Sequence, residues 1–201
     1  MKLFYAKGAC SLVVRIVINE IGLTSDFEAV NLKTKKTESG GDFLAVNSKG
    51  SVPVLKLDNG KILTENAIIL QYLADTSHAD NLLPNIGNFK RYQVLEWVNY
   101  CTTEMHKSFS SLFNPTIPQE IKDSVFIPLI KSKLNYINNH LEHNKYLLGE
   151  SFTLPDAYMF VMLMWASNFN LNLKDWEHVA RYFADLKKRK SIEKSLKDEG
   201  L

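Results

Sequence analysis

The chain has 201 residues, of which 24 are basic and 22 acidic, giving a formal net charge of +2, and 45% are hydrophobic. This composition is typical of a globular protein that buries a sizeable core. A charge so close to balance does not indicate a nucleic-acid or membrane-surface partner. The longest apolar run, residues 157–166, is shorter than the roughly 20 residues that span a bilayer, and it predicts a helix buried inside the fold.

The first 78 residues alternate strand and helix patterns in the order β-α-β-α-β-β-α. Gly22 is expected to end the first helix, and the Asn59-Gly60 pair predicts a hairpin with a type I′ turn between the last two strands. Residues 33–41 are expected to form a polar loop. Strands are predicted at 2–6, 26–32, 52–57 and 61–65, and helices at 10–23, 42–48 and 66–76.

After this α/β half, the pattern changes. Residues 79–88 contain Pro84 and Gly87 without a sustained period, which is typical of a linker. Every later segment has helical periodicity, so residues 89–201 predict an all-helical domain. Its lysine-rich end, residues 187–201, is expected to be a solvated final helix.

The two cysteines of the chain are Cys10 and Cys101, too few for a disulfide framework, and no Cys/His cluster indicates a metal. Since no apolar core of a signal peptide precedes them, we expect a cytoplasmic protein. Cys10 follows Gly8 and Ala9 at the expected start of the first helix, where amide N–H groups and the helix dipole lower the pKa of a thiol. Alternatively, Cys10 is a buried structural cysteine.

Glu65 and Asn66 stand at the start of the third predicted helix, with Asn66 as the expected N-cap. Taken alone, this pattern favours a capped helix with an exposed acid. The alternative is that these residues, together with the helix N-terminus, hold the amino and carboxylate groups of an amino-acid moiety. Pro53 stands at the start of the third strand, a position that needs no donor. Its bond to Val52 is expected to be trans, since few X-Pro bonds are cis, and a cis bond is the alternative.

A long helix is predicted over residues 91–113, with Asn99, Thr103, His106, Lys107 and Ser110 on one face. A polar helix face usually indicates plain solvent exposure. Because this one is short of acids, a cleft or a subunit contact is the alternative. Further on, Thr153 and Asp156 form a capping box that would start the buried helix.

In this order, the motifs GACS at 8–11, VP at 52–53, TEN at 64–66, NYCTTEMHK at 99–107 and FTLPDAY at 152–158 resemble those of cytosolic glutathione transferases, and most closely the bacterial beta class. The resemblance covers essentially the whole chain. It implies a thioredoxin-like domain over 1–78, a linker over 79–88 and an all-helical domain over 89–201. It also implies a homodimer that uses glutathione as a co-substrate, with no tightly bound cofactor.

The resemblance further implies roles for individual residues. Glutathione would be bound by Lys35, Val52, a cis Pro53, Glu65 and Asn66, and by Asn99 and Thr103 offered from the other subunit. Around the glutathione sulfur it places Cys10, Ser11, His106 and Lys107. The second-substrate pocket would be apolar, drawn from Phe109, Leu112, Phe113 and Trp165. The chain departs from the family at Asn66, where serine is usual.

From this resemblance we expect an enzyme that activates the thiol of glutathione for conjugation to hydrophobic electrophiles, or for thiol–disulfide exchange and peroxide reduction through Cys10. His106, with an ordinary pKa near 6.5, would assist proton movement. A second hypothesis is a non-catalytic carrier of glutathione or of hydrophobic ligands, or a regulatory protein on the same scaffold. A third is a glutathione-dependent isomerase or dehalogenase, which would differ in the second-substrate pocket.

Overall fold

The computed structural model describes all 201 residues and consists of two compact units. The first comprises Met1–Ala79 together with Arg189–Leu201, and the second is Asp80–Lys188. No helix combines the length and the apolar character that a membrane crossing requires.

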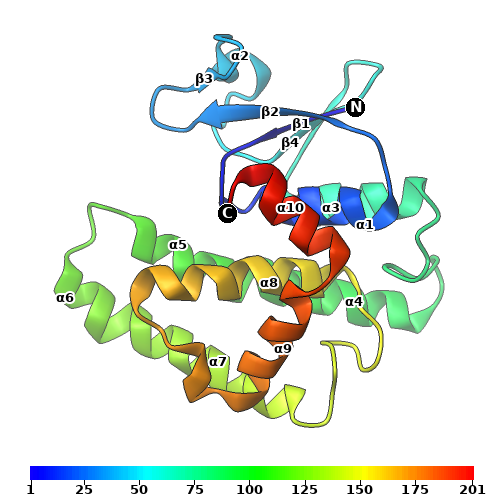
Figure 1. Cartoon of the computed structure of the whole chain (residues 1–201). Coiled ribbons are helices and arrows are strands. Elements are labelled where there is room, and N and C mark those ends of the chain that lie inside the picture. The colour runs from blue at the N-terminus through cyan, green and yellow to red at the C-terminus, as the bar shows by residue number, and fades with distance from the viewer. The chain divides into compact units, whose positions relative to one another are not determined.

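The first unit is built on a five-stranded sheet in the order β3-β2-β1-β4-β5 (Figure 1). Strands β1 and β2 are parallel, whereas the other neighbouring pairs are antiparallel. Its elements are β1 (Lys2–Tyr5), α1 (Leu12–Ile21), β2 (Asp26–Asn31), β3 (Lys36–Thr37), α2 (Phe43–Val46), β4 (Val54–Lys56), β5 (Ile62–Thr64), α3 (Asn66–Thr76) and α10 (Lys190–Glu199). This confirms the predicted thioredoxin-like order.

Alternation along the central strands divides the core of this unit into two layers. Leu3 is paired with Leu55, and Phe4 with Val54, so the two pairs lie on opposite faces of the sheet. Phe4 and Val54 pack with Phe43 of α2. Helices α1 and α3 lie together on the other side, as Figure 1 shows.

Two local predictions about this unit need correction. The loop predicted at 33–41 contains the short strand β3, because Lys36 and Thr37 pair with the end of β2. The predicted hairpin joins β4 to β5, but its turn is not type I′. That turn requires positive φ at both central residues, and in the loop only Gly60 has it, at 81°. Gly22, by contrast, ends α1 as predicted, in the left-handed conformation.

The last helix also differs from its prediction. Helix α10 was expected to be a solvated part of the helical domain, but it belongs to the first unit and lies along α1 (Figure 1). Its inner face buries Ser191, Ile192, Ser195 and Glu199. The polar residues of this face are buried because each has a partner in α1: Ser191 bonds to Glu20, Ser195 to Asn19 and Glu199 to Arg15.

The second unit is entirely helical, as predicted. Its elements are α4 (Phe89–Tyr100), the π-helical η1 (Cys101–His106), α5 (Lys107–Phe113), α6 (Gln119–Ile121), the π-helical η2 (Lys122–Phe126), α7 (Ile127–Leu141), α8 (Leu154–Ala166), the 3₁₀ turns η3 (Ser167–Phe169) and η4 (Leu173–Asp175), and α9 (Glu177–Lys187). The long helix predicted over 91–113 is therefore α4, η1 and α5 in continuity. Its π-helical turn was not visible in the sequence pattern.

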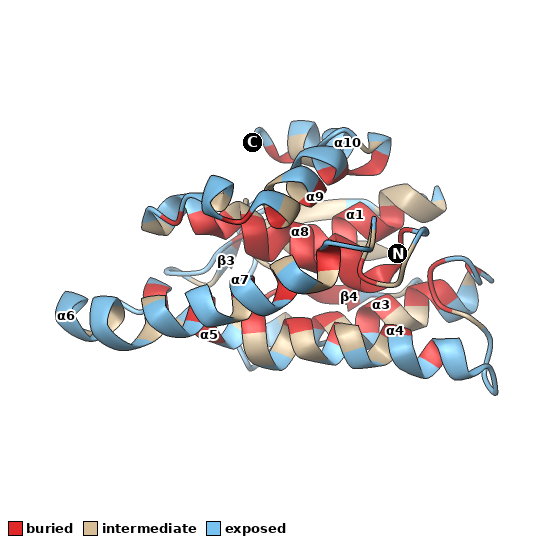
Figure 2. Ribbon diagram, turned by 90° about the horizontal axis from the view of Figure 1, so that it is seen from below, coloured by how far each residue is buried: buried red, intermediate tan, exposed pale blue.

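Helix α8 is the centre of this unit, and nearly its whole length is buried, as Figure 2 shows in red. The predicted capping box starts it: the backbone N–H and the hydroxyl of Thr153 both donate to the Asp156 carboxylate, at 2.8 and 3.0 Å. Leu147 N–H and the Tyr182 hydroxyl donate to the same carboxylate. Four donors thus satisfy a carboxylate that lies wholly inside the protein.

Candidate functional site

Cys10 lies in the loop between β1 and α1, two residues before the helix begins. Its side chain is partly buried, and the thiol Sγ donates to the backbone carbonyl of Val52 at 3.4 Å. The Val52–Pro53 peptide bond is cis, as the resemblance implies. Three predicted site residues are therefore brought together at the ends of β1 and β4.

The protonation of Cys10 differs from the expectation. Burial raises the pKa of its thiol to about 11, and hydrogen bonds from the Asn66 side chain and from backbone N–H groups lower it only in part. The prediction of a lowered thiol pKa is wrong for this structure. Burial destabilises the thiolate by more than the hydrogen bonds around it stabilise it. Cys10 is a neutral thiol at physiological pH.

Ser11 also departs from the role that the resemblance implies. Its hydroxyl donates to the Ala6 carbonyl at 3.3 Å and accepts from the Ala6 N–H at 3.1 Å. The side chain is completely buried. Both bonds close the loop of residues 6–11 onto itself, so in this structure Ser11 holds the loop and does not present a donor to a ligand.

Helix α3 begins one residue earlier than the predicted N-cap implies. The N-cap position belongs to Glu65, not to Asn66 as predicted, and Asn66 is the first helical residue. Glu65 has φ of 70°, which is unusual for a residue other than glycine, and its side chain is exposed. Asn66 is buried, and its Nδ2 donates to the Cys10 carbonyl at 3.1 Å.

Two lysines of the first unit, Lys35 and Lys49, contact residues near the Val52–Pro53 bond and at the start of α3. Lys35 Nζ donates to the Gly50 carbonyl at 2.7 Å, which places the cation close to the Val52–Pro53 segment. The neighbouring Lys33 and Lys36 are exposed. Lys49 was missed by the sequence reasoning, because a lysine in a polar loop has no distinguishing pattern. Its Nζ lies 2.7 Å from the Glu65 carboxylate and 3.1 Å from the Thr64 hydroxyl.

The remaining predicted residues belong to the second unit. Asn99 and Thr103 are exposed one turn apart, and the Thr103 hydroxyl donates to the Asn99 carbonyl at 3.0 Å. Lys107 is exposed at the start of α5. His106 ends the π-helical turn, and its Nδ1 lies 2.8 Å from the hydroxyl of Tyr158.

His106 is therefore in a different protonation state from the one expected. Burial, with a smaller contribution from the Lys107 charge, lowers its pKa from 6.5 to about 4. The expectation of an ordinary pKa near 6.5 is wrong, because the ring is packed edge-on against Tyr158 and Trp165 and loses water. A neutral imidazole still donates from one nitrogen and accepts at the other.

Three of the four residues predicted for an apolar pocket form one aromatic cluster, and Phe169 completes it. Trp165 lies between Phe109 and Phe113, with centroid distances of 6.2 and 5.1 Å. Phe169 contacts both phenylalanines, at 6.2 and 4.7 Å. Phe113 is 47% exposed, whereas Phe109 and Trp165 are buried. The cluster presents an aromatic edge to solvent.

The fourth residue, Leu112, is buried and lines a neighbouring pocket of about 550 Å³ together with Phe169. Neither Phe169 nor Tyr158 was predicted for the site. Tyr158 lies within the FTLPDAY motif, which predicts the start of the buried helix and contributes to the family resemblance but gives Tyr158 no role in the site. Phe169 ends the 3₁₀ turn η3 that follows the buried helix, where no periodicity marks it. No group of three or more His, Cys, Asp and Glu residues is placed to hold a metal ion.

Comparison with known proteins places these features in a wider group. Residues 8–76 match the family described as glutathione S-transferase, N-terminal domain, and residues 100–190 match glutathione S-transferase, C-terminal domain. Glutathione S-transferase GstA of Escherichia coli O157:H7 is 43% identical over the full length of both chains.

Two solved structures are similar over all of both chains. A sphingomonad glutathione S-transferase in complex with glutathione has a TM-score of 0.95 at 36% identity. A beta class glutathione S-transferase of Sphingomonas chungbukensis has a TM-score of 0.95 at 37% identity. Because both structures cover the whole chain, the structural similarity includes both of its units.

Proposed function

The chain belongs to the glutathione S-transferase family, and we propose that it binds glutathione on its first unit and activates the thiol for transfer to a hydrophobic electrophile. The beta class is the part of the family that it resembles, and the sphingomonad relative is known in complex with glutathione. One observation carries the proposal: the Val52 carbonyl, the Cys10 thiol and the start of α3 converge on one edge of the sheet.

The chemistry of these groups suits a γ-glutamyl tripeptide. The exposed Glu65 carboxylate would accept the α-ammonium of the γ-glutamyl group, and the start of α3 favours its carboxylate. The Val52 backbone would pair with the cysteinyl part, and Lys35 would attract the glycyl carboxylate. The positive φ of Glu65 supports this assignment, because strained residues persist where a function requires them.

Activation of glutathione would consist in the deprotonation of its thiol, because the thiolate is the nucleophile. The glutathione thiol loses its proton, and the thiolate forms a bond to an electrophilic carbon while the leaving group departs with its electron pair. Cys10 is a neutral thiol in the free protein, so the glutathione sulfur, and not Cys10, would be the nucleophile in conjugation. The aromatic cluster of Phe109, Phe113, Trp165 and Phe169 would contact the electrophile.

We extend the proposal to assembly and location. The exposed Asn99 and Thr103 would serve the glutathione of a second copy in a homodimer. Both cysteines are free thiols, which suits the reducing cytoplasm.

The test is steady-state conjugation of glutathione to a chlorodinitrobenzene, with glutathione binding measured separately by calorimetry. The proposal expects saturable glutathione binding and turnover above the uncatalysed rate. Binding without turnover on a panel of electrophiles would contradict it and favour the carrier hypothesis.

A further inference from the structure

We infer that Asn66 is a positioning residue for Cys10, which it holds from the first turn of α3 and whose thiolate it supports during exchange with a disulfide. The exchange itself rests on the proposed function, because its partner would be the disulfide of glutathione.

The geometry holds Cys10 from two sides. The Asn66 amide donates to the Cys10 carbonyl at 3.1 Å, and the Cys10 thiol donates to the Val52 carbonyl at 3.4 Å. Asn66 is only 6% exposed, so its amide is committed to the protein interior. A serine hydroxyl ends one bond closer to the backbone and has a single proton to donate. It would not span the same gap without a shift of α3 or of the Cys10 loop.

The electrostatics at the Cys10 thiol also support a role of Asn66 toward Cys10. Burial disfavours the Cys10 thiolate, and the adjacent Glu65 charge adds to the penalty. The hydrogen bond of the Asn66 side chain is the largest of the contributions that oppose them. Because amide donors stabilise an anion in a poorly hydrated site, losing Asn66 leaves the thiolate with less compensation.

The chemical step in which this matters is balanced as follows. The Cys10 thiol gives its proton to solvent, and the thiolate attacks one sulfur of glutathione disulfide. The disulfide bond breaks as the mixed disulfide of Cys10 and glutathione forms, and the other glutathione leaves as a thiolate that takes up a proton. Cys10 is oxidised, and one glutathione is released reduced. Asn66 acts by raising the fraction of Cys10 that can begin this step.

The experiment measures the rate of Cys10 alkylation by iodoacetamide in the protein without glutathione, with peptide mapping to identify the modified cysteine. The variants are Asn66→Ser and Asn66→Asp, which replaces the donor by an acceptor. The matched control is Asn19→Ser, which removes a similar, partly buried amide bond, from Asn19 Nδ2 to Ser195 at 2.8 Å, at the far end of α1. Cys101 is completely buried and serves as an internal reference.

Both Asn66 variants are expected to slow alkylation at neutral pH, by roughly three- to tenfold for Asn66→Ser, since a hydrogen bond of this kind contributes about 0.5–1.5 kcal/mol. The Asn19→Ser rate is expected to match the parent. A merely structural role of Asn66 would loosen the site, expose the thiol and give an unchanged or faster rate. Either of those results would overturn the inference.

A second measurement separates this inference from the proposed function. Mass spectrometry of the parent protein after incubation with glutathione disulfide should show the mixed disulfide on Cys10, and less of it in Asn66→Ser after equal times. Slower alkylation together with no mixed disulfide in any variant would uphold the role of Asn66 toward Cys10 and refute exchange with glutathione.

Discussion

The Nδ1 atom of His106 in η1 lies 2.8 Å from the hydroxyl oxygen of Tyr158 in α8. This contact joins the π-helical turn to the most buried helix of the second unit, and the ring of Trp165 packs edge-on against the same imidazole, 5.3 Å away. A π-helical turn within an α-helix is often found at a functional site. Here it brings His106 into an aromatic environment in which the imidazole stays neutral.

The lowered pKa of His106 predicts a pH dependence of stability. Between about pH 6.5 and about pH 4, the unfolded chain binds a proton at His106 that the folded chain does not. The free energy of unfolding therefore falls as the pH drops through this window. Urea unfolding at pH 5 and pH 7 should show a smaller fall in His106→Asn than in the parent. Equal falls in the two proteins would contradict the buried, neutral state of His106.

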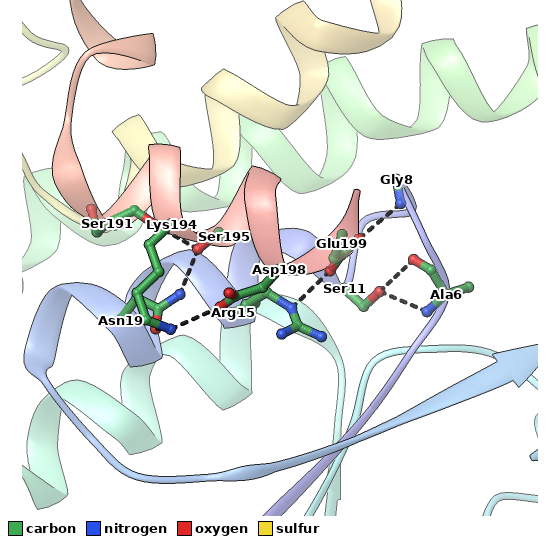
Figure 3. A network of polar contacts seen from close by, with 10 residues as sticks. All are labelled: Ala6, Gly8, Ser11, Arg15, Asn19, Ser191, Lys194, Ser195, Asp198 and Glu199. Atoms are coloured by element: carbon green, nitrogen blue, oxygen red, sulfur yellow. Dashed lines mark hydrogen bonds and ion pairs between the residues drawn. The ribbon is translucent and has the colours of Figure 1, made fainter. Parts of the chain in front are cut away.

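The ion pair between Arg15 of α1 and Glu199 of α10 predicts a large loss of stability on mutation. Both side chains are almost completely buried, and Glu199 also accepts from the Gly8 N–H at 2.9 Å (Figure 3). The guanidinium lies against the rings of Tyr5 and Phe27. Glu199→Gln leaves the Arg15 charge buried without its counter-ion, which costs about 3–5 kcal/mol. Thermal and urea unfolding measure the change.

The matched control lies on the exposed side of the same helix. Lys194 pairs with Asp198 at 2.7 Å in solvent, and the Lys194→Ala variant should change stability by less than about 1 kcal/mol. Similar losses in Glu199→Gln and Lys194→Ala would show that α10 is held by its overall packing and not by the buried pair.

The conformation of Glu65 predicts opposite effects on stability and on binding. Glycine adopts φ of 70° readily, so Glu65→Gly relieves a backbone strain of about 1–3 kcal/mol at a smaller entropic cost in the unfolded chain. The exposed ion pair to Lys49 contributes little. We expect Glu65→Gly to be at least as stable as the parent in urea, with glutathione affinity at least tenfold lower by calorimetry. An unchanged affinity would remove Glu65 from the proposed binding site.

Two phenylalanines of α5 are expected to respond differently to truncation. Phe113 is 47% exposed at the edge of the aromatic cluster, so Phe113→Ala should raise the KM for an aromatic electrophile several-fold with little change in unfolding. Phe109 is completely buried, and Phe109→Ala should cost about 3–5 kcal/mol of stability. Steady-state kinetics and urea unfolding of both variants test the assignment, which fails if Phe113→Ala leaves every electrophile's KM unchanged.

The order of strands and helices followed from the sequence because it depends on local patterns. A short apolar run indicated β1, and alternation indicated β2. The spacing of apolar residues indicated α1, α2, α3, the long helix over 91–113, the buried helix α8 and the helical character of the rest of the second half. Gly22 ended α1, and Thr153 with Asp156 began α8, since caps act within a single turn. The π-helical turns were not predicted, because a short change in the hydrogen-bond pattern of a helix leaves the spacing of its apolar residues almost unchanged.

The sequence by itself thus determined the two-part architecture and the family to which the chain belongs. Only the tertiary structure decided what the side chains do. It turned the Ser11 hydroxyl inward to Ala6, joined the Asn66 amide to Cys10, and paired Gly8 with Glu199, 191 residues further along the chain. The same packing set the pKa of Cys10 and of His106. Both pKa values depend on which distant groups exclude water from a site, and no local pattern records that.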